Sequence, residues 1–201
     1  MKFILGRKLN MTQIFDNEGV VHPTTLVEVS PIVVTQVKTK ETDGYNAVQV
    51  ASGVKKAERI NKAMKGHMKD LGAFASLREF RVNEVNNKVG DKIDLNQFKQ
   101  GDAIEVSAIS KGKGFQGVVK RNGFGGGPRT HGQKHSEREP GSIGGGLRNK
   151  VPKKMRMAGR MGSDRVTIKN LRVLHVDPSA NIMYISGAIP GKRGTLVEIV
   201  G

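Results

Sequence analysis

The stretch from Asn122 to Lys150 constrains the fold of this chain more than any other part of it. It reads NGFGGGPRTHGQKHSEREPGSIGGGLRNK, rich in glycine and basic side chains and with almost no side chain that could build a core. A segment that folds must bury apolar surface to offset the entropy lost by its chain. We therefore expect this stretch either to be ordered by a partner or to remain disordered.

The charge of the chain indicates what that partner is. The net charge is +16, and residues 111–165 hold 14 basic and only 3 acidic side chains. Such a concentration favours a polyanion, either nucleic acid or an anionic membrane surface. A membrane-binding helix needs a continuous apolar face, and Pro152, Gly159 and Gly162 interrupt the one candidate segment. RNA is the better partner, and we expect no membrane contact.

Other classes of protein are excluded by what the sequence lacks. Without cysteine there is no disulfide, zinc–thiolate site or thiol nucleophile. No apolar run has the length of a membrane span. The start, MKFILGRKLNMTQIF, lacks the long apolar region of a signal peptide and is interpreted as a first strand.

The rest of the chain has the pattern of short antiparallel strands, rich in valine and threonine and separated by turn residues. We predict a mainly β protein, an antiparallel barrel or sandwich, whose first part is residues 1–110 and whose second part is residues 165–201. A helical insertion is expected near 55–72, where Gly66 interrupts the pattern and favours either two short helical pieces or one poor helix. The basic, glycine-rich extension comprises residues 111–164. The predicted strands are Val20–Val29, Ile32–Thr39, Asn46–Ser52, Leu77–Val82, Ala103–Ser110, Arg165–Asn170, Leu171–Asp177, Ile182–Ile189 and Thr195–Val200.

Three short motifs resemble catalytic or nucleotide-binding signatures and fail on inspection. Gly112–Gly117 matches G-x-G-x-x-G, but a dinucleotide site needs a helix next and an acidic strand end roughly 20 positions later. The segment Gly187–Arg193 resembles a P-loop, but Ser186 stands where that motif needs glycine and Arg193 where it needs serine or threonine. Ser142–Gly144 lacks the first glycine of a nucleophile elbow, where Pro140 stands. We expect no enzyme activity, no catalytic residue and no cofactor.

His131 and His135 are four residues apart, with Glu137 nearby. A metal site would need a rigid scaffold and a third ligand, so contacts with RNA or plain solvent exposure are the better interpretations, and no metal is expected. Cationic side chains neutralise phosphates, whereas Phe124 can stack on bases. The candidate RNA-binding residues are Lys113, Lys120, Arg121, Asn122, Phe124, Arg129, His131, Lys134, His135, Arg138, Arg148, Lys150, Lys153, Lys154, Arg156 and Arg160.

Several of these segments together resemble a known family. SKGKGFQGVVKRNGFGGGPRTHG (Ser110–Gly132), PGSIG (Pro140–Gly144), KKMRMAGRMGSDRVTIKNLRVLHVD (Lys153–Asp177), GAIPGKRG (Gly187–Gly194) and LGRKLNMTQIFDNEG (Leu5–Gly19) are similar, in this order, to the bacterial form of the universal third protein of the large ribosomal subunit. The resemblance covers essentially the whole chain.

The resemblance implies a translation-protein-type β-barrel with a small α-containing insertion and a long, basic, non-globular extension. It implies a cytoplasmic protein of the ribosome that binds the large-subunit (23S) rRNA near its 3′ end, helps to nucleate assembly and contacts neighbouring ribosomal proteins rather than forming a homo-oligomer. The extension would reach towards the peptidyl transferase centre. Its implied tip is Ser142, Ile143, Gly144, Gly145, Gly146, Leu147 and Arg148.

One position departs from that family. Many relatives carry a methylated glutamine after Gly-Ser-Ile-Gly, and here Gly145 stands in its place. The resemblance therefore implies that this modification is absent. Arg148 is the candidate for replacing the lost polar contact at the tip.

Overall fold

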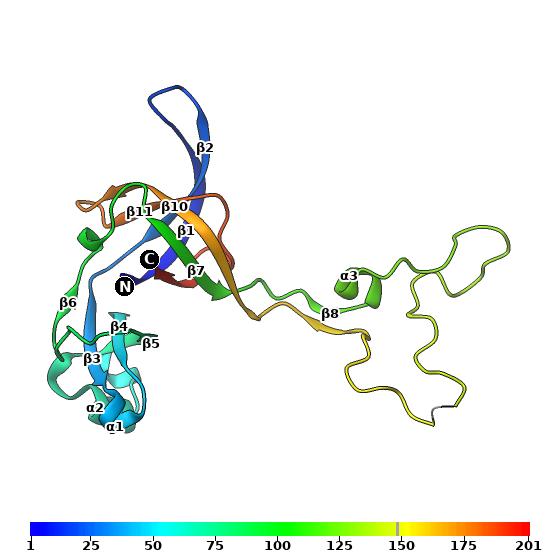
Figure 1. Cartoon of the computed structure of the whole chain (residues 1–201), viewed down its shortest axis with the longest axis horizontal. Coiled ribbons are helices and arrows are strands. Elements are labelled where there is room, and N and C mark those ends of the chain that lie inside the picture. The colour runs from blue at the N-terminus through cyan, green and yellow to red at the C-terminus, as the bar shows by residue number, and fades with distance from the viewer. Residues whose placement is uncertain (148) are drawn as a thin grey trace. The chain divides into compact units, whose positions relative to one another are not determined.

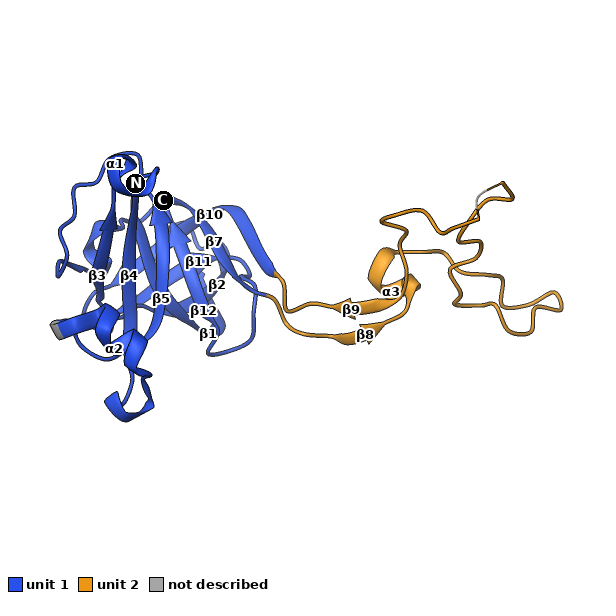
Figure 2. Ribbon diagram, turned by 90° about the horizontal axis from the view of Figure 1, so that it is seen from below, with its two compact units in different colours: residues 1–109, 165–201 blue, residues 110–164 orange. Residues whose placement is uncertain are grey.

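The computed structural model describes residues 1–147 and 149–201 and divides the chain into two compact units (Figure 2). Unit 1 consists of residues 1–109 and 165–201, and unit 2 consists of residues 110–164. Segments far apart in the sequence thus build one unit. The segment between them forms the other.

Unit 1 contains a closed barrel of six strands, and every neighbouring pair in it is antiparallel (Figure 1). This confirms the predicted mainly β fold with an antiparallel barrel. In order around the barrel the strands are β1 (Phe3–Phe15), β12 (Leu196–Val200), β7 (Ala103–Ile109), β10 (Arg165–Asp177), β11 (Ile182–Ser186) and β2 (Val21–Glu28).

Alternation of side chains along each strand explains why this sequence closes around a core. In a strand, successive side chains point to opposite faces. In β11 the buried residues are Met183 and Ile185, and in β12 they are Val197 and Ile199, in each case with less buried neighbours between them. All four are fully buried and belong to one apolar cluster. The barrel interior is therefore a packed core and leaves the outer face for contacts.

Three strands that the sequence analysis assigned to the barrel lie elsewhere in unit 1. β3 (Ile32–Lys38), β4 (Ala47–Val54) and β5 (Phe74–Arg81), with the short β6 (Lys92–Ile93), form a separate sheet in the order β5-β4-β3-β6. The difference has a physical cause, because period-two alternation shows that a strand has a buried face without showing which sheet it joins. The rings of Phe3 in β1 and Phe80 in β5 stack with centroids 4.8 Å apart, so sheet and barrel share the core.

The helical insertion is smaller than the sequence suggests. It comprises α2 (Lys62–Met68), with short 3₁₀ turns at Ala57–Arg59 and Lys69–Leu71, whereas the four-residue α1 (Lys40–Asp43) lies outside it, between β3 and β4. Of the two expected arrangements, two short pieces or one poor helix, the α-helical part is a single short helix, α2, with Gly66 inside it. Asn61 caps α2 by accepting a hydrogen bond from the amide of Met64 at 2.8 Å, and the buried Met68 anchors its end.

β10 also differs from expectation. Two strands were predicted, meeting between Asn170 and Leu171, and the structure has one continuous strand of 13 residues. Its pairing with β7 shifts between Ile168 and Leu171, and Asn170 adopts a φ of 59° at that irregularity. The predicted boundary is therefore a β-bulge within one strand.

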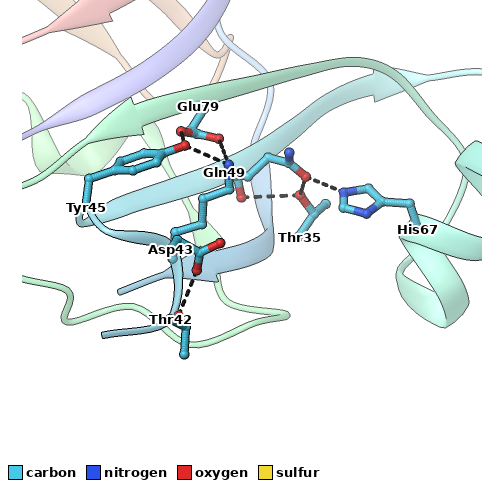
Figure 3. Close-up of polar contacts among 8 residues, drawn as sticks. Thr35, Thr42, Asp43, Tyr45, Gln49, His67 and Glu79 are labelled. Atoms are coloured by element: carbon cyan, nitrogen blue, oxygen red, sulfur yellow. Dashed lines mark hydrogen bonds and ion pairs between the residues drawn. The ribbon is translucent and has the colours of Figure 1, made fainter. Parts of the chain in front are cut away.

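A polar cluster covers one part of the four-stranded sheet (Figure 3). The Lys38 ammonium lies 2.7 Å from the Glu79 carboxylate and donates to the Tyr45 hydroxyl at 2.8 Å, and that hydroxyl donates to Glu79 at 2.7 Å. The hydrogen bonds from Lys38 and Tyr45 lower the pKa of Glu79, and Glu79 in turn raises the pKa of Lys38. The three side chains tie β3 to β5 across β4.

A second set of polar contacts joins α2 to the same sheet. Thr35 donates to the side-chain oxygen of Gln49 at 2.9 Å, and His67 Nε2 lies 2.5 Å from that oxygen (Figure 3). Gln49 thus links β3, β4 and α2.

None of the helices in residues 1–147 and 149–201 has the length and apolar composition needed to cross a membrane.

Candidate nucleic-acid interface

A short hairpin forms the stem of unit 2. β8 (Gly114–Gln116) pairs with β9 (Gly159–Met161), with Phe115 opposite Arg160. Backbone hydrogen bonds continue from this hairpin to the ends of unit 2. The amide of Lys113 donates to the carbonyl of Met161, and the amide of Ser110 donates to the carbonyl of Asp164, both at 2.9 Å. The first and last residues of unit 2 are therefore held side by side.

Gly162 allows the two strands of this stem to approach closely. Its φ is +78°, and a Cβ on it would overlap the carbonyl oxygen of Lys111. Any other residue would meet both a strained backbone and a steric clash. This glycine is required by the protein's own chain.

A helix follows the glycine motif at Gly112–Gly117, which the sequence analysis did not foresee. It is α3 (Val118–Asn122), five residues long, with Gly117 as its N-cap and Gly123 in the left-handed conformation at its end. Val118 is buried, and it is the one buried side chain in the described part of unit 2. The dinucleotide interpretation still fails, because β8 pairs antiparallel with β9 and no parallel β-α-β unit is formed.

Two candidate RNA-binding residues on α3 contact the protein's own backbone. Arg121 Nη1 donates to the carbonyl oxygen of Met157 at 2.7 Å, and Asn122 Nδ2 donates to the same oxygen at 3.2 Å. A Cβ at Gly159 would lie 2.7 Å from Arg121 Nη1. Both side chains therefore fasten α3 to residues 157–159, the segment that returns to the stem. The sequence did not indicate this role. Their contact with RNA stays a prediction.

The glycine run after α3 folds back on the chain. Gly127 donates from its amide to the carbonyl of Glu137 at 3.0 Å. A Cβ on Gly126 would overlap that same carbonyl oxygen, and one on Gly127 would lie 2.9 Å from the carbonyl oxygen of Ser136. Arg129 and Glu137 form an ion pair at 2.7 Å. Residues 126–137 thus make a closed loop.

Beside this loop is an open hollow of about 540 Å³. Phe124, half-buried, and Pro140 lie on its walls, and glycine backbone makes up much of the remainder. A flat apolar wall next to exposed backbone can receive a base or a sugar. Its lining residues are Phe124, Gly125, Gly126, Gly127, Ser136, Glu139, Pro140 and Gly141.

The predicted cations are presented to solvent. Arg129 is the one cation in the described residues of unit 2 with an ion-pair partner, and its side chain is still 79% exposed. Arg148 lies outside the described residues. The exposed candidates are Lys113, Lys120, Arg121, Arg129, His131, Lys134, His135, Arg138, Lys150, Lys153, Lys154, Arg156 and Arg160.

His131 and His135 are both exposed, and His131 has a φ of 58°. Throughout the described residues, no three histidine, aspartate or glutamate side chains gather in a way that could hold a metal ion. The pair is therefore available for contacts with RNA or solvent.

The implied tip presents backbone more than side chains. Ser142 donates to the carbonyl of Gly144 at 2.7 Å and so closes a tight turn. A Cβ on Gly144, Gly145 or Gly146 would meet no atom within 4 Å. Leu147 is completely exposed. These glycines, unlike Gly126 and Gly162, are not required by contacts within the chain.

Over most of its length the chain is similar to proteins of one known family. A family model described as ribosomal protein L3 matches residues 47–184. The chain is 47% identical to large ribosomal subunit protein uL3 of Herpetosiphon aurantiacus. The 199 aligned residues cover 98% of this chain and 94% of that protein. It is 48% identical to the uL3 protein of Dehalococcoides mccartyi, over 98% of this chain and 96% of that protein. It is 43% identical to the uL3 protein of Finegoldia magna, over 99% of this chain and 97% of that protein.

Proposed function

This chain belongs to the ribosomal protein L3 family, and we propose that it binds the large-subunit rRNA directly through the exposed cations of unit 2. It is a structural constituent of the large ribosomal subunit and not an enzyme. The sequence-based assignment to the bacterial form of this family is thereby confirmed.

The exposure of unit 2 is the observation that carries this proposal. Its described residues bury one side chain, Val118, while its many cations are exposed. Unpaired cations at this density repel one another, so a polyanion that neutralises them stabilises the segment. An rRNA does this with phosphates, and its bases can stack on Phe124.

We infer the finer placement from the family resemblance. The barrel lies on the outside of the subunit near the 3′ end of the rRNA, and binding there helps to nucleate assembly. The tip at residues 142–148 extends towards the peptidyl transferase centre. Three open glycines at positions 144–146 support this inference, because they leave room for RNA backbone or bases to approach.

Direct rRNA binding is tested by neutralising two exposed lysines of unit 2. The double variant Lys153→Ala with Lys154→Ala removes two phosphate contacts, each worth about 0.7 to 0.9 in the slope of log affinity against log salt. We expect weaker binding to protein-free large-subunit rRNA and a slope that is smaller by roughly one to two units.

Lys62→Ala with Lys65→Ala, on exposed positions of α2, is the control of equal charge loss. It should change the slope by less than the first pair does. Identical slopes for both double variants would show that the effect is one of net charge alone. If the unaltered protein neither binds this rRNA nor sediments with large subunits in a gradient, the proposal fails.

The placement of the tip is tested separately with Gly145→Leu. The bulky side chain should leave affinity and salt slope nearly unchanged, because the cations of unit 2 remain. It should alter the rate of peptide transfer, or the response to drugs that bind that centre, in purified subunits. Gly66→Leu, at an equally open glycine in α2, is the control. Unaltered transfer and drug response in subunits that contain Gly145→Leu would mean that the tip lies elsewhere in the chain or tolerates a bulky side chain, and the placement would be withdrawn.

A further inference from the structure

Unit 1 has a hollow of about 560 Å³ that lies outside the predicted RNA-binding segment. Its volume is within the range of roughly 300 to 1,000 Å³ that is typical of ligand clefts. The hollow lies beside the β1–β2 hairpin and the strands β10 and β11. Its lining residues are Ile14, Phe15, Asp16, Asn17, His22, Gln100, Gly101, Arg172, Val173, Leu174, His175 and Tyr184.

Ring side chains gather at this hollow although the chain has few of them. The sequence holds 7 phenylalanines, 2 tyrosines, 5 histidines and no tryptophan, and four of these rings line the one hollow. Phe15 is 60% exposed, and the His22 side chain is 41% exposed. Tyr184 is half-buried and His175 is exposed. None of these four rings belongs to the buried apolar cluster of unit 1.

Strand pairing places the four rings. His175 in β10 is directly opposite Tyr184 in β11, and their rings meet edge to face with centroids 5.3 Å apart. Phe15 ends β1, and His22 lies in the partner strand β2, opposite Ile14. Two pairs of neighbouring strands thus supply two rings each. The arrangement depends on the barrel and cannot be seen from sequence spacing.

The charges at the hollow suit a ligand with a negative group and a polar edge. Arg172 is exposed, its amide held by the Ser186 hydroxyl at 2.9 Å, and no carboxylate among the described residues pairs with its guanidinium. Asp16 accepts hydrogen bonds from the amides of Glu18 and Val20, both at 2.9 Å, and its other oxygen lies 3.0 Å from His22. The one carboxylate lining the hollow is therefore already engaged, whereas the cation is not.

We propose that this hollow binds an unpaired nucleobase of the large-subunit rRNA, stacked on the rings of Phe15 and Tyr184, with an adjacent phosphate on Arg172. A base combines a flat face for the rings with a polar edge, which Asn17 and Gln100 can match, whereas an aliphatic side chain of a protein would leave these amides unsatisfied. The inference rests on the proposed function, since it takes rRNA as the partner. It adds a base-binding site on the barrel to the cations of unit 2.

Ring and charge variants separate stacking from phosphate binding. Stacking of one base on an aromatic ring accounts for roughly a fivefold to 150-fold difference in affinity and involves no counterion release. Tyr184→Leu should therefore weaken binding to protein-free large-subunit rRNA within that range and leave the salt slope unchanged, while Tyr184→Phe keeps the ring and the affinity. Arg172→Gln should instead reduce the slope by about 0.7 to 0.9.

Folding is controlled for by a second variant. Phe15 is largely exposed, so Phe15→Leu should not destabilise the barrel, and its thermal midpoint should match that of the unaltered protein. It should weaken rRNA binding in the same way as Tyr184→Leu. Affinity unchanged by Phe15→Leu and by a folded Tyr184→Leu overturns the proposal.

Ultraviolet cross-linking in intact large subunits identifies the occupant. We expect a nucleotide attached to the peptide that contains Tyr184 or to the one that contains Phe15. Attachment to another ribosomal protein, or no attachment at either ring, overturns the base site. In both cases the proposed function still holds if the Lys153 and Lys154 variant behaves as expected, so the two failures are distinguishable.

Discussion

At the scale of single residues, the glycines of unit 2 have two different roles. Gly126 and Gly162 have positive φ values, and a Cβ on either would overlap a carbonyl oxygen of the same chain. Gly144, Gly145 and Gly146 have open space around them. The first pair is required for the fold of unit 2, and the second group is available to a partner.

The variant Gly162→Ala tests the first role. The left-handed conformation costs an alanine about 1 to 2 kcal/mol, and the overlap with the Lys111 carbonyl adds to that cost. The amide of Lys113, bonded to Met161, should exchange its hydrogen at least about tenfold faster. Gly125→Ala, where a Cβ meets nothing within 4 Å, is the control and should leave this rate unchanged. Equal rates for both variants would mean that the stem tolerates a Cβ at position 162.

Glu79 gives a prediction about pH. Hydrogen bonds from Lys38 and Tyr45 hold the pKa of Glu79 below its ordinary value of about 4.3. A carboxylate with a lowered pKa stabilises the fold above that ordinary value, and its contribution is lost as the pH falls through the lowered one. Glu79→Gln should therefore lower the denaturant midpoint of unit 1 at pH 7.

The deficit caused by Glu79→Gln should shrink as the pH falls below the ordinary glutamate pKa, because the unaltered protein then loses the same contribution. Urea unfolding at several pH values measures it. Glu84→Gln, at an exposed carboxylate, is the control. A deficit that stays constant down to pH 3 would show that ionisation of Glu79 is not its source.

At the scale of elements, α3 is held by side chains that sequence reasoning assigned to RNA. A five-residue helix is too short to be stable alone, so its contacts with the returning segment decide whether it forms. Arg121 supplies the shortest of these contacts, at 2.7 Å to the Met157 carbonyl. Its neighbour Lys120 is exposed, and its ammonium forms no hydrogen bond or ion pair within the described residues.

Neutralising these two neighbours should have different effects. Arg121→Gln should weaken rRNA binding by loosening the stem and leave the salt slope nearly unchanged, because Arg121 is engaged with backbone. Lys120→Gln should reduce the slope by about 0.7 to 0.9, as expected for a phosphate contact. Affinities at four or more salt concentrations decide the matter. Equal slope changes would make Arg121 a phosphate contact as well.

At the scale of the whole molecule, the two units differ in how they are stabilised. The apolar cluster of buried residues in the described chain lies wholly within unit 1, and unit 2 buries Val118. Apolar burial is the dominant stabilising term in folding. Unit 1 should therefore be folded in the free protein, and most of unit 2 should depend on its partner.

Amide hydrogen exchange of the isolated protein tests this difference. Residues 122–162 include 8 of the hydrophobic class among 41, and their amides should exchange rapidly while those of the barrel strands are protected. Addition of large-subunit rRNA should slow exchange through the segment. Strong protection of residues 122–162 without RNA would show that unit 2 is stable alone.

The sequence by itself determined the class of fold and the location of the charge. Period-two alternation in strands such as β11 and β12 reflects one buried face. This pattern involves only neighbouring residues, so it can be recognised in the sequence. The same holds for the cations of residues 111–165, because charge and the scarcity of apolar side chains are compositional. The family resemblance, too, depended on motifs that are contiguous in the chain.

Only the tertiary structure decided which strands pair and which side chains meet. Nothing in the valine-rich β3 and β4 indicated that they would leave the barrel for a second sheet, since alternation does not encode the partner. Arg121 meets Met157 across 36 residues of sequence, and Phe15 and Tyr184 reach one hollow from opposite ends of the chain. Such contacts arise from chain closure in three dimensions, which local patterns do not record.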